Sequence, residues 1–167
     1  MADTTQYFAM MKAEDLIKTL QLAPHPEGGW YREIYRSADR VQRGDQSRSA
    51  TTAIYYLLER QQLSRWHVVD ADEIWHFYAG SPLELLAYDP SSRRLTRHVL
   101  NAPDGAAAPI GIIPAGVWQA ARSQGEYSLV GCTVSPGFEF SGFRFTADLP
   151  GHRDHFTGEL AKFATLL

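Results

Sequence analysis

The spacing of hydrophobic and polar positions changes once along the chain, near Trp30. Before it, apolar residues recur three and four positions apart, as on one face of a helix, at Ala13, Leu16, Ile17 and Leu20. Glu14 and Asp15 stand where the first turn of this helix favours acidic groups. Pro24 cannot continue the helix. The pattern therefore predicts one helix near the start of the chain.

From Trp30 onward the pattern is typical of short strands separated by turns. The expected strands cover residues 30–36, 51–58, 73–78, 83–88, 93–100, 110–113, 117–121, 127–134 and 138–145. Residues 101–109 form a loop rich in Ala, Pro and Gly, and a polar tail from Pro150 ends in a short helix from Gly158. No internal repeat or linker divides the chain, so residues 1–167 are expected to be a single all-β domain.

Composition fits a globular domain, because 44% of the 167 residues are hydrophobic and 21% are charged. The net charge of −3 predicts no nucleic-acid partner and no anionic membrane surface. The most apolar stretch, residues 106–118, is broken by two prolines and is too short for a membrane span of about 20 residues. The first residues lack the pattern of a signal peptide. A soluble, cytoplasmic protein is expected, with the single Cys132 in its core.

The densest group of reactive side chains lies between Ser64 and Gly80, and it includes His67 and Glu73. A His and a carboxylate on neighbouring strands can share a metal ion or a proton. Alternation along the predicted strand at residues 73–78 places its side chains on two opposite faces. One face carries Glu73, Trp75 and Phe77, and the other carries Ile74, His76 and Tyr78. A Pro-Ala-Gly turn at residues 114–116 then delivers Trp118 and Gln119 onto the next strand.

These residues resemble the two motifs of the cupin superfamily. Glu73 and Gly80 match the second half of the first motif, and Pro114, Gly116 and Gln119 occupy the positions of Pro, Gly and His in the second. Residues 25–33, 54–58, 72–76 and 132–140 are similar to the cupin branch long carried as a domain of unknown function. The resemblance covers about residues 14–150. It implies a double-stranded β-helix, or jelly roll, with a pocket inside the barrel, and commonly a homodimer. It implies no particular reaction, because one fold hosts many.

The chain departs from the metal-binding pattern of typical cupins, which offer two His and a Glu from the first motif and a His from the second. His67, Glu73 and Gln119 remain as candidate ligands. His67 is one residue out of strict spacing from Glu73, which a β-bulge would correct. Gln binds divalent transition metals more weakly than imidazole does. One hypothesis is therefore a weakly bound divalent metal in an oxygenase or hydrolase.

The leading hypothesis needs no metal. Cupin-fold sugar epimerases are similar in carrying a lone strand His that acts as a base beside a Tyr acid. That resemblance implies His67 as base, oriented by Glu73, with Tyr55 or Tyr56 as acid. The substrate would be a small polar molecule such as a sugar, a nucleotide-sugar or an organic acid. Ser64, His67, Glu73 and Gln119 would line the polar end of the pocket, with Trp75, Trp118 and one of the tyrosines at the apolar end.

A third hypothesis is a non-catalytic binding or sensor module, in which His67 is a hydrogen-bonded core residue. Other polar groups are interpreted structurally. His76 is expected at the surface or in a dimer interface, and His152 and His155 are expected to be solvated. Residues 25–29, His-Pro-Glu-Gly-Gly, are interpreted as a turn that joins the helix to the first strand, with its glycines serving backbone geometry.

Overall fold

The computed structural model describes residues 11–103 and 108–167. The first residues, where no signal peptide is expected, and residues 104–107 of the predicted loop lie outside this range. In chain order the elements are α2 (Ala13–Thr19), β1 (Ala23–Pro24), β2 (Trp30–Arg36), β3 (Arg40–Arg43), β4 (Gln46–Ser49), β5 (Thr52–Glu59), β6 (Leu63–Val69), β7 (Asp72–Gly80), β8 (Leu83–Asp89), β9 (Arg94–Leu100), β10 (Ile110–Ile113), β11 (Trp118–Ser123), β12 (Tyr127–Ser135), β13 (Phe143–Phe145) and four 3₁₀ helices, η1 (Phe140–Gly142), η2 (Thr146–Asp148), η3 (His152–Asp154) and η4 (Leu160–Leu166).

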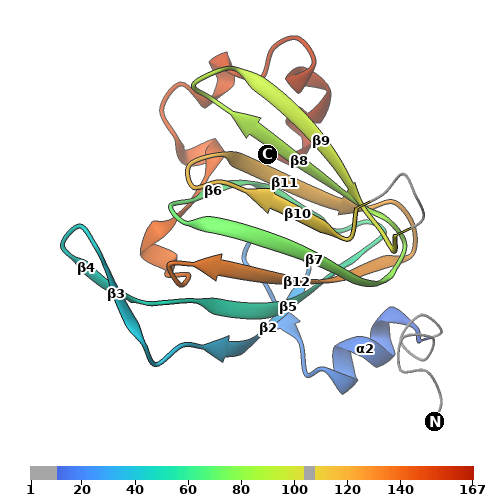
Figure 1. Ribbon diagram of the computed structural model, residues 1–167. Helices are drawn as coiled ribbons and strands as arrows, with labels where there is room; N and C mark the ends of the chain where they lie inside the picture. The colour runs from blue at the N-terminus through green and yellow to red at the C-terminus, as the bar shows by residue number, and fades with distance from the viewer. Residues whose placement is uncertain (1–10, 104–107) are drawn as a thin grey trace.

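Two sheets face each other to form the barrel (Figure 1). One sheet has the strand order β1-β2-β5-β12-β7-β10, the other has the order β13-β6-β11-β8-β9, and neighbouring strands are antiparallel. The arrangement confirms the predicted all-β jelly roll with an N-terminal helix. The expected alternation on β7 is also confirmed for Glu73 and Trp75, which are both buried.

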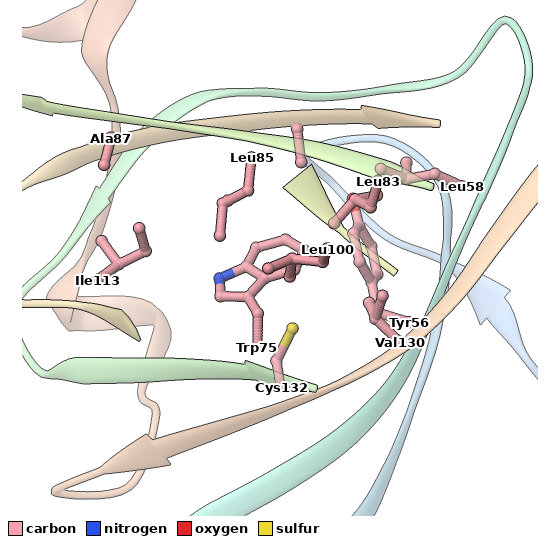
Figure 2. Packing of buried hydrophobic residues seen from close by; sticks show 11 residues of the cluster. Tyr56, Leu58, Trp75, Leu83, Leu85, Ala87, Leu100, Ile113, Val130 and Cys132 are labelled. Carbon is pink, nitrogen blue, oxygen red and sulfur yellow. The ribbon is translucent and has the colours of Figure 1, made fainter. Parts of the chain in front are cut away.

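The space between the sheets is closed on one side by an apolar cluster around Trp75. Figure 2 shows its indole ring among Leu85, Leu100 and Cys132, with Tyr56 beyond them. These residues come from strands of both sheets, so the cluster joins the two layers. A smaller cluster that includes Phe143 lies elsewhere in the barrel.

The predicted helix is present as α2, and its Leu16 is fully buried against Leu57 and Leu129 of the six-stranded sheet. The helix ends at Thr19, and Pro24 lies in the short strand β1. No helix among residues 11–103 and 108–167 is long and apolar enough to cross a membrane.

A polar hairpin, β3 and β4, was not predicted from the sequence. Its strands contain little apolar surface, so hydrophobic alternation gives no signal there. The hairpin turns at Gly44, whose φ of +56° favours glycine, and it is attached to the barrel through Arg48. The buried Arg48 guanidinium donates to both carboxylate oxygens of Asp70, each at 2.7 Å.

The C-terminal segment is not the polar tail that the sequence suggested. Leu160 and Leu166 are buried against Trp66 and Trp118 on the outer face of the five-stranded sheet. Figure 1 shows the segment as the orange and red coils beside β8 and β9. His155 is also not simply solvated, because its Nδ1 lies 3.0 Å from the hydroxyl of Tyr88. Apolar positions in 3₁₀ turns lack the regular periods that reveal helices and strands.

We predict that Leu160→Ala will lower the free energy of unfolding by about 2–4 kcal/mol, because it empties a packed site. The exposed Lys162→Ala on the same segment should change it by less than about 0.5 kcal/mol. Urea denaturation followed by tryptophan fluorescence measures both variants. Equal stability of Leu160→Ala and wild type would show that the segment does not belong to the core.

Candidate active site

A β-bulge in β6 brings two polar side chains into the barrel. Ser64 pairs with Ala121 and His67 pairs with Gln119, so the stretch of β6 contains one more residue than the stretch of β11 opposite. The extra residue lets Ser64 and His67, three positions apart, both face inward, and both are almost completely buried. Trp66, between them, faces the outer cluster. This bulge lies on the side of His67 away from Glu73, so it does not change the number of residues between His67 and Glu73.

His67 is held in one tautomer by the bulge itself. Its Nδ1 lies 2.7 Å from the carbonyl oxygen of Arg65, which can only accept, so Nδ1 carries a proton. Nε2 lies 3.2 Å from Oε2 of Glu27. The imidazole ring stacks on Phe143, with centroids 5.1 Å apart. Nε2 is therefore the nitrogen free to exchange a proton with Glu27.

Glu27 reaches His67 from the loop between β1 and β2. Gly28 follows it at a φ of +117°, and a Cβ at this position would clash with the carbonyl oxygen of Leu63, so only glycine permits the close approach. Ser64 Oγ donates to Glu27 Oε1 at 3.1 Å. The backbone N–H of Arg65 donates to the carbonyl oxygen of Glu27 at 3.1 Å. The loop is thereby fastened to β6 beside the bulge.

A second carboxyl group, Glu73, is fixed by a chain of hydrogen bonds. The Trp75 indole N–H donates to Gln119 Oε1 at 3.0 Å, and Gln119 Nε2 donates to Glu73 Oε2 at 2.6 Å. An indole nitrogen can only donate, so Trp75 determines which end of the Gln119 amide faces Glu73. Trp75, a residue of the apolar core, therefore determines that Glu73 accepts from the amide nitrogen of Gln119.

Both carboxyl groups and both imidazoles of this region line one cavity of about 130 Å³. Its polar side holds His25, Glu27, His67 and Glu73. Its remaining wall is largely aromatic and aliphatic, and it includes Ile54, Val69, Cys132, Val134, Phe138, Phe140 and Phe143. A concave, mostly apolar pocket with a few convergent polar groups is typical of small-molecule sites.

Burial shifts the pKa of each ionisable group towards its neutral form. It raises the pKa of the Glu27 and Glu73 carboxyl groups and lowers the pKa of the His67 imidazole. The nearby Glu73 partly offsets the effect on His67. Burial also raises the pKa of the Cys132 thiol, which is therefore not a ready nucleophile. Titratable groups shifted in this way in a cavity are typical of functional sites.

The three side chains expected to hold a metal do not fit that role in this structure. Gln119 presents its amide nitrogen to Glu73, and its oxygen already accepts from Trp75. Within the described ranges, no three His, Cys, Asp or Glu side chains are grouped so that they could hold a metal ion. Gln119 would have to break two hydrogen bonds to become an oxygen ligand beside His67.

The other predicted site residues fall into two groups. Ser64, Trp75 and Gln119 lie behind the cavity and support Glu27 or Glu73 through hydrogen bonds. Tyr56 is also internal: its hydroxyl donates to the carbonyl oxygen of Gly28 at 2.8 Å, and burial raises its pKa well above the ordinary value, which disfavours a role as acid.

Tyr55 and Trp118 lie away from the cavity. Alternation along β5 directs Tyr55 to the outer face, where its ring meets that of Tyr78 at a centroid distance of 6.1 Å. Trp118 packs in the outer cluster against Phe156, because Gln119 takes the inward position on β11. Trp118 was expected at the apolar end of the pocket. It lies instead on the outer face of the five-stranded sheet, where the C-terminal segment covers it. His76 is half-buried, with Nε2 3.4 Å from the hydroxyl of Thr133.

Sequence reasoning missed His25 and Glu27 as site residues, because the surrounding glycines indicated only a turn. The signal available was a carboxylate next to two glycines within a segment already similar to a known family. Arg36, Glu33 and Glu139, which also line the cavity, gave no signal, because charged residues are common on exposed strands and loops.

Comparisons with known proteins agree with this architecture. A family model described as cupin superfamily (DUF985) matches residues 14–146. A solved protein from Shewanella oneidensis is 36% identical, with a TM-score of 0.76, over 87% of this chain and 93% of its own. A hypothetical protein from Leishmania major is also 36% identical, with a TM-score of 0.73, over 80% of this chain and 86% of its own.

A more distant similarity extends to Bacillus subtilis oxalate decarboxylase, which is 12% identical with a TM-score of 0.56. It covers 86% of this chain and 36% of the decarboxylase, and at this identity it shows the fold alone. No curated protein sequence matches the chain. The family match and the two close structures show that the chain belongs to the cupin superfamily, in the family described as DUF985.

Proposed function

We propose that this protein is an enzyme that moves a proton on a small molecule bound in the barrel, as an isomerase or epimerase does. The observation that carries the proposal is the contact between His67 Nε2 and Glu27 Oε2 in the wall of the cavity. Because Nδ1 is already protonated, the contact requires a proton between the carboxyl group and Nε2. The pair thus holds one transferable proton next to the space for a ligand.

Burial favours the neutral form of the pair, in which Glu27 carries the proton and donates it to Nε2. This arrangement suits a general acid, because the proton is ordered and lies away from bulk water. It also changes the role expected of His67. The imidazole acts together with Glu27 as an acid–base pair instead of acting as a lone base.

Glu73 supplies the complementary base. Gln119 donates to its Oε2, which favours the carboxylate, whereas burial raises its pKa towards the range where a carboxylate is an effective base. In the proposed reaction Glu73 removes a proton from a carbon next to a carbonyl group, and the proton shared by Glu27 and His67 moves to the carbonyl oxygen. The product is an enol, or an enediol where the carbon bears a hydroxyl group. It collapses when a proton returns to carbon and another leaves oxygen, so both enzyme groups are restored.

The first test is exchange of carbon-bound hydrogen with solvent. The protein is incubated in D₂O with three- to five-carbon aldoses, ketoses and keto acids, and deuterium incorporation is followed by NMR. We expect at least one compound to exchange, with a loss of about 10²-fold or more in Glu73→Gln and His67→Ala. Glu126→Gln and His98→Ala, which lie outside the cavity, serve as matched controls and should exchange at the wild-type rate.

Two results would contradict the proposal. Exchange that persists in Glu73→Gln and His67→Ala would remove both residues from the chemistry. A compound that binds in the cavity without exchange or conversion would favour the non-catalytic binding module.

The second test uses Glu27→Gln, which imitates the protonated carboxyl group. Its amide oxygen can accept from Ser64 and its amide nitrogen can donate to His67 Nε2. In the wild type the folded-state pKa of Glu27 is raised above 4.5, so Glu27 contributes stability at low pH that is lost as the pH rises towards the folded-state pKa. The variant lacks this loss. The free energy of unfolding of the variant, relative to that of the wild type, should therefore rise by up to about 1.4 kcal/mol per pH unit between pH 4.5 and the folded-state pKa of Glu27, and should level off above it.

Denaturant unfolding at a series of pH values measures the difference, with the exposed Glu126→Gln as control. A difference that does not change with pH, or that falls as the pH rises, would show that Glu27 is ionised in the folded protein. The same variant should lose exchange activity while remaining folded, because an amide cannot release a proton to the substrate.

A further inference from the structure

The lining of the cavity, taken as a whole, contains more acidic side chains than permanently cationic ones. Glu27 and Glu73 lie inside, and Glu33 and Glu139 lie at the mouth with side chains 40% and 42% exposed. Burial lowers the pKa of both lining imidazoles, His25 and His67, so they add no lasting positive charge. Even with both inner carboxyl groups neutral, the two outer carboxylates outnumber the guanidinium of Arg36, the cation that the described residues contribute to this lining.

Arg36 is already engaged. Its Nε and Nη2 donate to the two carboxylate oxygens of Glu33 at 3.0 and 2.8 Å, and its Nη1 donates to Glu139 Oε1 at 2.9 Å. Nη2 also donates to the carbonyl oxygen of Phe138 at 3.2 Å. Two carboxylates and a carbonyl group thus use most of its five donors. A ligand carboxylate or phosphate would have to displace these partners before it could pair with Arg36.

The walls and the volume of the cavity further limit the type and the size of ligand that it can hold. Aromatic rings line the cavity beside the acceptors, with His25 stacked near Phe140 at a centroid distance of 6.4 Å and His67 stacked on Phe143. Such rings suit the C–H faces of a small ligand and do not compensate a negative charge. A cavity of about 150 Å³ is known to hold benzene, so a cavity of about 130 Å³ fits a ligand of about six non-hydrogen atoms.

We infer that the site takes a small molecule rich in hydroxyl or amino donors and without a negative charge, and that it discriminates against carboxylates and phosphates. The inference rests on the proposed function, because it names the substrate class of the same cavity. Of the classes that the sequence allowed, it retains neutral sugars and removes organic acids and nucleotide-sugars; neutral polyols carry the same donor groups. The carboxyl oxygens of the wall accept from the donors of the ligand.

The test compares three probes that share a three-carbon skeleton: glycerol, which is neutral, serinol, which is a cation, and glycerate, which is an anion. Ligand-observed NMR titration of the full chain measures the affinity of each. We expect glycerol and serinol to bind, and glycerate to bind about tenfold more weakly or not at all. Binding of glycerate as tight as that of glycerol would overturn the inference, as would the absence of binding by both glycerol and serinol.

The double variant Glu33→Gln/Glu139→Gln provides a second measurement. It leaves the charge of Arg36 uncompensated at the mouth, so affinity for glycerate should rise by about tenfold relative to glycerol. Glu126→Gln/Glu159→Gln removes the same number of exposed charges elsewhere and should leave the ratio unchanged. An unchanged ratio of glycerate to glycerol affinity in Glu33→Gln/Glu139→Gln would contradict the inference that Glu33 and Glu139 keep anions away from Arg36.

The outcomes separate this inference from the proposed function. Solvent exchange on an anionic substrate such as a keto acid would support the proton-transfer chemistry and overturn the charge preference. Binding of neutral and cationic probes alone, with no exchange in any compound, would support the charge preference and contradict the enzyme.

Discussion

The β-bulge between Ser64 and His67 is the constraint on which the candidate site depends. Regular alternation would turn one of these two side chains out of the barrel. One extra residue in β6 turns both inward and sends Trp66 to the outer face, where its indole N–H donates to the carbonyl oxygen of Phe163 at 2.9 Å. The same irregularity therefore positions the imidazole inside and anchors the C-terminal segment outside.

Burying so many polar groups is unfavourable unless each finds a partner. The two carboxyl groups meet this requirement in different ways. Glu27 is held by Ser64 and His67, whereas Glu73 is held by Gln119, which is oriented by the core residue Trp75. Each carboxyl group thus has its own supporting residues, so the two can differ in protonation although they line the same cavity. That difference is what acid–base chemistry by a pair of carboxyl groups requires.

Alternation and turn residues were enough to predict α2, most of the strands and the inward position of Glu73. They failed where the local pattern carries no hydrophobic signal. The polar hairpin β3–β4 depends on the ion pair between Arg48 and Asp70, which are 22 positions apart. Of the strand predicted at residues 138–145, only residues 143–145 form a strand, β13, which pairs with β6. The C-terminal 3₁₀ turns depend on packing against Trp66 of β6 and Trp118 of β11. The inward faces of β5 and β11 became known only once strand pairing showed Tyr56 and Gln119 inside.

The helix, the succession of strands and the resemblance of the motifs to those of cupins could be predicted from the sequence, because they follow from residue order over a few positions. Two contacts become known only from the folded chain: Glu27 contacts His67, 40 positions away, and Glu33 and Glu139 both accept hydrogen bonds from Arg36. These contacts arise from a loop seated on a bulge and from strands brought together by antiparallel pairing. The direction of a side chain in such a loop or bulge depends on partners distant in the sequence, so local hydrophobic periodicity does not predict it.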